Sequence, residues 1–299
     1  MTRGASSSTV VNTDVVRPPL NRRIAVITSV TVILAIGVIV ALAITSSSIG
    51  PSTSITLPPH PATHLQYPLG TPNKTELSGM GLPGPKALPG YTMIYASNFP
   101  GKALPTGWVS YSGQPANDRG AEYAVTHVVV RGDSLRITTW RDPDFQNRWV
   151  TGGVCQCGMP QTYGAFFVRS RDTGGGATSV QLLYPESDVW PPEVDFNENE
   201  GQIDSTTSTV HFGPTNQVDQ RILSINMLRW HTWGIIWSPK SIKYTVDGVL
   251  WASVNTPSEI PTIPMRISLQ QQTFCLEGRL CPSAPVAMLV NWVAEYRAT

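Results

Sequence analysis

Residues 91–299 are predicted to form an all-β fold, a two-sheet β-sandwich or jelly roll, on the basis of three observations. This part of the chain consists of short runs rich in Val, Ile, Thr, Tyr, Trp and Phe, separated by Gly, Pro, Asp and Asn. None of the runs shows a sustained helical period. The pair Asp247 and Gly248 between two runs is a strong hairpin signal. About a dozen strands at hairpin spacing are typical of a sandwich.

The expected strands have ordinary strand lengths and are each bounded by turn residues. In chain order they are AVTHVVV (124–130), SLRITTW (134–140), YGAFFVRSR (163–171), SVQLLY (179–184), EVDFNE (193–198), TSTVHF (207–212), HTWGIIWS (231–238), SIKYTVDG (241–248), VLWASV (249–254), MRISLQQQ (265–272) and AMLVNWVAEYR (287–297).

The composition suits a folded domain without a strong electric field. Of the 299 residues, 41% are hydrophobic and 8% aromatic, and the formal net charge is +1. Lys and Arg form no stripe, so we expect no nucleic-acid partner. We expect a monomer that uses no cofactor and no metal ion.

The N-terminal part predicts a membrane anchor. Residues 24–45 carry no charge and are long enough to cross a bilayer as a transmembrane helix. Because Arg22 and Arg23 precede this segment and no basic residue follows it closely, residues 1–23 are expected to be a cytoplasmic tail. The rest of the chain would then be extracytoplasmic, held at the cell membrane by a single pass. The alternative is a secretory signal peptide cleaved after Ala43.

Residues 46–90 are rich in Pro, Ser, Thr and Gly, so we interpret them as a linker to the domain at 91–299. Four cysteines lie in that domain, and outside the cell they are expected to form disulfides. Cys275 with Cys281 closes a short loop easily, whereas Cys155 with Cys157 would be strained. All three connectivities stay open.

Three carboxylates, Glu193, Asp195 and Glu198, lie within six residues of strand-like sequence. In a flat strand Glu193 and Asp195 share a face, and Glu198 points to the other face. A β-bulge at Phe196 or Asn197 would bring all three to one face. Their repulsion would then raise at least one pKa, as acid/base chemistry on a glycosidic bond requires.

The string EVDFNE matches the E-x-D-x-x-E signature of family 16 glycoside hydrolases, which the chain resembles. This family includes β-1,3-glucanases, laminarinases and lichenases. Further similar segments are YGAFFVRSR before the signature, TVHFG after it, the hairpin in 230–250 and VNWVAEYR in 290–297. The resemblance covers about 200 residues and implies a concanavalin A-like jelly roll. Gln202 stands where the family usually has a basic residue or Asn, which leaves the subfamily open.

The resemblance implies a retaining endo-glycosidase that hydrolyses a β-linked polysaccharide, of the β-1,3- or mixed β-glucan type, by double displacement. Glu193 would be the nucleophile, Glu198 the acid/base, and Asp195 the residue that holds and tunes them. The two glutamate carboxyls must then approach to about 5 to 5.5 Å. A transglycosylase on the same scaffold and a non-catalytic carbohydrate-binding protein are the alternatives. A calcium site would need more oxygen ligands than this strand offers.

Candidate substrate-binding residues are aromatic rings that stack on sugar faces and polar groups that bind hydroxyls. Trp233 and Trp237 share parity in one strand and are interpreted as core residues. The candidates for substrate binding are Trp190, Trp149, His211, Gln270 and Gln272.

Overall fold

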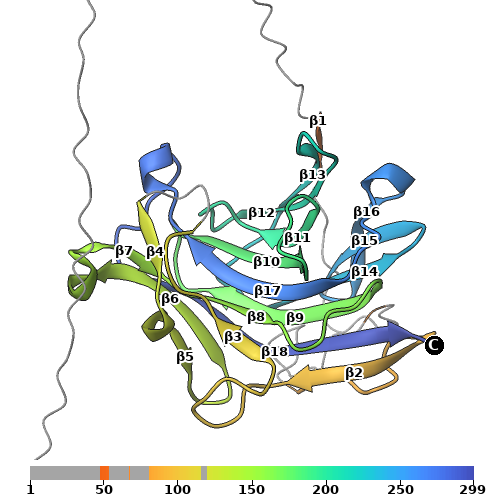
Figure 1. The fold of residues 1–299 in the computed structure, drawn as a ribbon, viewed down its shortest axis with the longest axis horizontal. Coiled ribbons are helices and arrows are strands. Elements are labelled where there is room, and N and C mark those ends of the chain that lie inside the picture. Colours follow the sequence, from red (N-terminus) through yellow and green to blue (C-terminus); the bar gives the residue numbers. More distant parts are fainter. Residues whose placement is uncertain (1–47, 54–66, 68–80, 116–119) are drawn as a thin grey trace, which may run out of the picture. The chain divides into compact units, whose positions relative to one another are not determined.

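The computed structural model describes residues 48–53, 67, 81–115 and 120–299, and its strands form two sheets that pack face to face (Figure 1). Sheet I has eight strands. In spatial order they are β1 (Ser48–Thr53), β13 (Gln217–Ser224), β12 (Ser205–Phe212), β11 (Glu193–Glu198), β10 (Thr178–Pro185), β17 (Met265–Gln272), β8 (Gly153–Gln156) and β3 (Trp108–Ser110).

Sheet II has ten strands, eight of them along one path. In spatial order these are β16 (Val249–Val254), β15 (Ser241–Val246), β14 (His231–Ser238), β9 (Gly164–Asp172), β18 (Val286–Ala298), β6 (Leu135–Asp142), β7 (Arg148–Thr151) and β4 (Ala121–Tyr123). Strand β2 (Tyr91–Ser97) pairs with β18, and β5 (Val128–Val130) pairs with β6. Four short 3-10 helices complete the described elements: η1 (Val125–His127), η2 (Pro143–Phe145), η3 (Pro257–Glu259) and η4 (Cys275–Glu277).

The predicted all-β sandwich is confirmed, but the strands β1, β2, β3, β4, β7 and β8 were not expected, and two further local differences follow. The run 124–130 begins as the 3-10 turn η1 because the ring of His127 is buried against Asp142 and the carbonyl of Thr138. Strand β13 was not among the expected strands. It is largely half-exposed, so its sequence lacks the apolar alternation that marks a strand with one buried face.

The main core lies between the sheets. Val194, Phe196 and Val210 contribute to it from sheet I, and Trp233 and Trp237 from sheet II. Both tryptophans are almost completely buried, so their interpretation as core residues is confirmed. This core fixes which side chains of sheet I must point to the opposite face.

A second apolar cluster covers the outer face of sheet II. Leu88 packs there with Trp292 and Tyr296, and the Tyr296 hydroxyl donates to the carbonyl of Gly84. Gly84 and Leu88, which lie in the expected linker, therefore pack against sheet II. The earlier strand β1 pairs in parallel with β13 at the edge of sheet I.

The expected cytoplasmic tail and membrane segment, residues 1–45, lie outside the described residues. In the part of the chain that the structure does describe, no helix has the length and apolar character needed to span a membrane. The four cysteines pair locally, Cys155 with Cys157 and Cys275 with Cys281, which decides among the three open connectivities. In each pair the Cα atoms are 5.1 Å apart, within the usual range for a disulfide.

Candidate active site

Strand β11 carries the three carboxylates, and its pairing loses register on both sides. Three steps along β11, from Asp195 to Glu198, are matched by two steps along β12. On the other side, Asp195 and Asn197 pair with adjacent residues of β10. One extra residue is therefore inserted in β11, and the β-bulge predicted at Phe196 or Asn197 is confirmed.

The bulge places all three carboxylates on the face of sheet I that is turned away from the core. Val194 and Phe196 point into the core and are fully buried. Glu193, Asp195 and Glu198 instead line a cavity of about 750 Å³. This volume lies within the usual range for ligand sites, about 300 to 1,000 Å³.

Burial raises the pKa of each of the three carboxyl groups. Loss of hydration, followed by the charge of Asp195, raises the pKa of Glu193 to about 8. Burial and then the charge of Glu198 raise the pKa of Asp195 well above its ordinary value. Burial and then the charge of Glu200 raise the pKa of Glu198 to about 7. Glu193 and Asp195 also hydrogen-bond to each other, so one of them carries a proton.

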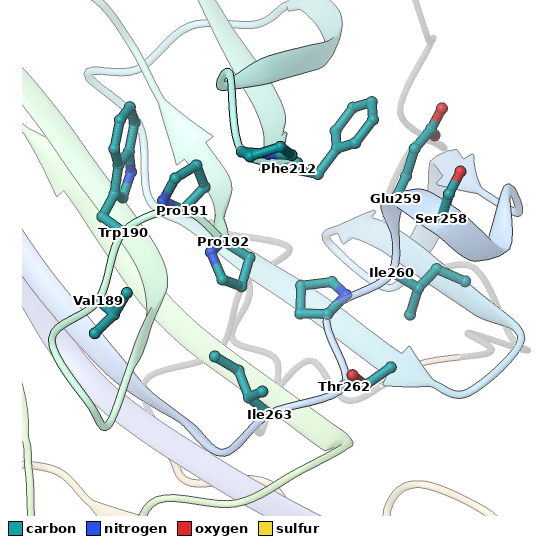
Figure 2. Close-up of a pocket in the computed structure, with 13 residues that line it drawn as sticks. Val189, Trp190, Pro191, Pro192, Phe212, Ser258, Glu259, Ile260, Thr262 and Ile263 are labelled. Carbon is teal, nitrogen blue, oxygen red and sulfur yellow. The ribbon is translucent and has the colours of Figure 1, made fainter.

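Trp190 connects the carboxylates to the rim of the cavity. Its indole Nε1 donates a hydrogen bond of 2.6 Å to Oε2 of Glu193, which favours the ionised form of that group. The side chain is 41% exposed, which leaves ring surface for a ligand. Trp190 also borders a second, more apolar cavity of about 440 Å³, formed with Pro191, Pro192 and Phe212 (Figure 2).

His211 lies across from Glu193 on β12 and faces the second acid. Its Nε2 is 3.4 Å from Oδ2 of Asp195, and its Nδ1 is 2.9 Å from Oδ1 of Asn216. Because the amide oxygen of Asn216 only accepts, Nδ1 carries a proton, and Nε2 is the atom that can exchange a proton with Asp195. The structure thus brings this predicted residue into the site.

A buried polar network holds the end of β11 directly after Glu198. Oδ1 of Asn199 accepts from the backbone N–H groups of Ser179 (2.8 Å) and Gly201 (3.0 Å). Nδ2 of Asn199 donates to Asp172, 2.8 Å away, and the Ser179 hydroxyl donates to the same carboxyl group at 2.7 Å. Burial raises the pKa of Asp172 to about 7, although both hydrogen bonds oppose that shift.

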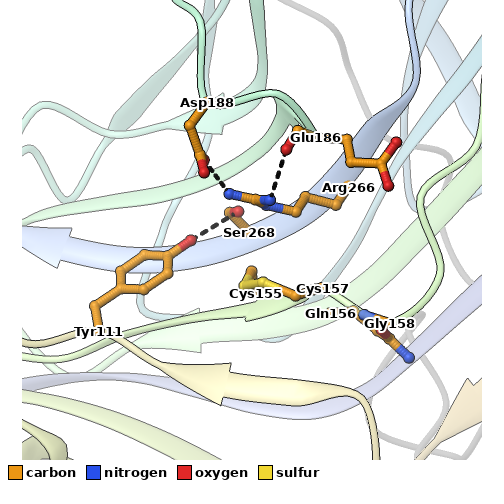
Figure 3. The surroundings of a disulfide bond; sticks show 9 residues. All are labelled: Tyr111, Cys155, Gln156, Cys157, Gly158, Glu186, Asp188, Arg266 and Ser268. Carbon is orange, nitrogen blue, oxygen red and sulfur yellow. Dashed lines mark hydrogen bonds and ion pairs between the residues drawn. A yellow bond between two sulfur atoms is a disulfide. The ribbon is translucent and has the colours of Figure 1, made fainter.

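Three tyrosines contribute to the wall of the cavity. Tyr111 lies over Gly153, where a Cβ atom would come within 2.3 Å of the tyrosine ring, so only glycine admits the ring there. The Tyr111 hydroxyl donates to Ser268 on β17 at 2.8 Å (Figure 3). The ring of Tyr111 meets that of Tyr123 edge-on. Tyr184 on β10 also lines the cavity.

Polar side chains from β17 line the same cavity. Gln270 and Gln272 alternate with buried residues and face it together with Ser268, as their spacing predicts. Arg266, one strand position earlier on that face, is held by the carbonyl of Glu186 (3.2 Å) and by an ion pair with Asp188 (Figure 3). The result is a cleft with acids at its floor and with rings and amides on its walls.

The sequence model of glycosyl hydrolases family 16 matches residues 117–272, which is more than half of the chain and includes the three carboxylates. This chain belongs to family 16. It is therefore a glycoside hydrolase, and the predicted family is confirmed.

One relative is similar to this chain in sequence, and two solved structures are similar to it in fold. The endo-1,3-1,4-beta-glycanase ExsH of Rhizobium meliloti is 30% identical over 105 residues, an alignment that covers 33% of this chain and 23% of that protein. The laminarinase of Rhodothermus marinus has a similar fold, with a TM-score of 0.63 and 20% identity over 70% of this chain and 98% of that one. The laminarinase catalytic domain of Thermotoga petrophila has a TM-score of 0.61 at 14% identity, over 70% and 98% of the two chains.

One expected cleft residue is placed elsewhere in this family 16 domain. Trp149 lies on β7 of sheet II, is 8% exposed and packs under the guanidinium of Arg141 at 5.0 Å. It is not among the residues that line the cavity, so its interpretation as a subsite wall is wrong. The physical reason is that its side chain is buried beneath Arg141 and does not face the cavity, which the local sequence does not reveal.

Several cavity residues of the family 16 site were not predicted. Tyr184 had a usable signal, because it shares parity with Val180 and Leu182 on the strand beside β11. Arg266 had a similar signal, because it shares parity with Gln270 and Gln272 on β17. The others come from distant segments whose sequences carry no such signal: Tyr111, Tyr123, Phe274 and Arg279. Among the residues described, no three or more His, Cys, Asp or Glu side chains converge to form a metal site.

Proposed function

We propose that this family 16 domain is an endo-acting β-glucanase that cleaves a β-1,3- or mixed-linked glucan by double displacement with retention of configuration. The observation that carries the proposal is the bulge in β11, which collects three carboxyl groups with raised pKa values at the floor of one cavity. Two carboxyl groups with different protonation states are the groups that a retaining glycosidase uses. The names of the relatives support the choice of glucan.

In the first step Glu193 attacks the anomeric carbon while Glu198 donates its proton to the departing glycosidic oxygen. The pKa of about 7 leaves much of Glu198 protonated near neutral pH, as this step requires. The hydrogen bond from Trp190 to Glu193 favours the carboxylate that attacks. Glu193 must be ionised to attack, so the proton shared by Glu193 and Asp195 resides on Asp195 in this step. Asp195 contacts both Glu193 and His211.

In the second step Glu198, now ionised, removes a proton from water as the water attacks the covalent glycosyl ester on Glu193. The same intermediate would serve a transglycosylase, with a sugar hydroxyl in place of water. Trp190 and the tyrosines offer stacking surfaces for glucose rings, and Gln270, Gln272 and His211 offer partners for hydroxyl groups.

A hydrolysis screen tests this proposal. We expect the protein to release reducing oligosaccharides from laminarin or from a mixed-linked glucan, and proton NMR at early times should show the β-anomer first. Early release of the α-anomer would contradict retention. Products longer than the substrate would favour a transglycosylase, and binding without any cleavage would favour the carbohydrate-binding alternative.

The proposed acid/base predicts a pH effect of Glu200, which lies near Glu198. The negative charge of Glu200 raises the pKa of Glu198, so Glu200→Gln lowers that pKa. Glu198 then loses its proton at lower pH, and the limb of the kcat/KM profile that reports Glu198 should move to lower pH. A pH profile of both proteins checks this. An unchanged or higher limb would argue against Glu198 as the general acid.

We also propose that the domain works outside the cytoplasm, attached to the membrane through residues 24–45. The pairing of all four cysteines in disulfides supports an oxidising compartment.

A further inference from the structure

We propose that Arg279 binds an anionic group on the polysaccharide, either a carboxylate or a sulfate ester, so that the substrate is an acidic β-glucan rather than a neutral one. This inference rests on the proposed function, because Arg279 lines the same cavity as Glu198.

A closed loop holds Arg279 at the rim of the cavity. The disulfide between Cys275 and Cys281 closes the loop, and the backbone N–H of Arg279 donates to the carbonyl of Phe274 at 3.3 Å. Gly278 forms the turn that precedes Arg279. Its φ of +79° lies in the left-handed region, which favours glycine. The disulfide and this hydrogen bond therefore fix the backbone position of Arg279.

The guanidinium of Arg279 stacks on a cavity residue. Its Cζ atom lies 4.8 Å from the ring centroid of Phe274, which also lines the cavity. Stacking occupies the flat face of a guanidinium and leaves the N–H groups at its edge available. That edge matches the geometry of a carboxylate or sulfate.

Within the described residues, no carboxylate forms an ion pair with Arg279. The arginines that do form ion pairs there are other ones. Arg266 provides the contrast, because Asp188 and the carbonyl of Glu186 already occupy it. Glu198 experiences the charge of Arg279, which opposes the rise in its pKa, but the two are not an ion pair. Among the described residues that line the cavity, Arg279 is therefore a cation without a carboxylate partner.

Neutral and acidic substrates with the same backbone test this inference. The probes are a β-1,3-glucan oligosaccharide, the same oligosaccharide oxidised to carboxylate at C6, and a sulfated form. For the native protein the ratio of kcat/KM on an anionic probe to kcat/KM on the neutral probe should exceed one. Arg279→Gln should lower this ratio by about tenfold, the value of one charge-assisted contact.

Two further variants keep the readout specific. Arg279→Lys retains the positive charge but lacks the planar guanidinium. Its ratio of kcat/KM on the anionic probe to kcat/KM on the neutral probe should therefore lie between those of the native protein and Arg279→Gln. Arg136→Gln removes an exposed arginine of β6 outside the cavity and should leave the ratio unchanged. Each variant is assayed at its own pH optimum, because the change at Arg279 also alters the pKa of Glu198. The carboxylate and sulfate arms show which anion is recognised.

The inference would be overturned if the native protein gave a kcat/KM ratio at or below one for both anionic probes. It would also be overturned if Arg279→Gln gave the same ratio as the native protein. In both cases, cleavage of the neutral glucan would still uphold the proposed function. Failure of the native protein to cleave any of the three probes would instead overturn the proposed function.

Discussion

Replacing Glu193 with Gln is expected to lower kcat for glucan hydrolysis by at least about 10⁴-fold, because no covalent glycosyl ester can form without the carboxylate. The amide keeps the size of the side chain and leaves the other two acids in place. Reducing-end assays on the purified protein measure the loss. Residual activity above about one per cent of the native value would show that Glu193 is not the nucleophile.

Glu186→Gln is the matched control for this substitution. Glu186 is exposed and does not line the cavity, and it contacts Arg266 through its backbone carbonyl, which the substitution leaves unchanged. Its activity should stay within about twofold of the native protein, as for most surface changes.

Azide separates the roles of the two glutamates. In Glu193→Ala, azide can enter the space of the lost carboxylate and attack from the α face, so an α-glycosyl azide is expected from an activated aryl glycoside. In Glu198→Ala, the glycosyl ester still forms, and azide attacks it from the opposite face to give the β-glycosyl azide. Exchange of these two products between the variants would reverse the assignment of nucleophile and acid/base.

Replacing Asn199 with Ala is expected to cause the largest loss of stability from a single change at this site. The change leaves the buried N–H groups of Ser179 and Gly201 without their acceptor and removes a donor from Asp172. At about 1 to 3 kcal/mol for each buried group left unsatisfied, the free energy of unfolding should fall by about 3 kcal/mol or more. For a domain of this size the melting temperature should fall by roughly 6 to 12 °C.

Thermal unfolding followed by circular dichroism measures this effect, and Asn255→Ala is its control. Asn255 is exposed and makes a single side-chain hydrogen bond, to Ser253, so its removal should change stability by less than about 0.5 kcal/mol. A melting temperature for Asn199→Ala equal to that of the control would show that the network does not hold the end of β11.

The strand that carries the acids was predictable because its information is local. Side chains alternate along a strand, so the spacing of Glu193, Asp195 and Glu198 demanded one extra residue, and Val194 and Phe196 indicated which face is buried. The same parity argument correctly placed Gln270 and Gln272 in the cavity once β17 lay in the same sheet. Trp190, three residues before Glu193, was close enough in sequence for its contact to be expected.

Residues brought in from other segments could not be found in this way. Tyr111 reaches the cavity because β3 pairs with β8 at the far edge of sheet I and because Gly153 leaves room for its ring. Trp149 was misplaced because its ring is buried beneath Arg141, a contact that the sequence does not indicate. Asn199 and Asp172 are 27 residues apart, and neither position suggests the other.

The sequence by itself determined the family, the all-β class and the bulged strand with its three acids, because alternation and turn chemistry act between near neighbours. Only the tertiary structure decided which rings and cations surround those acids and which cysteines pair. Those outcomes depend on strand order and on loop closure across the sandwich, and such long-range pairings leave no periodic trace in the chain.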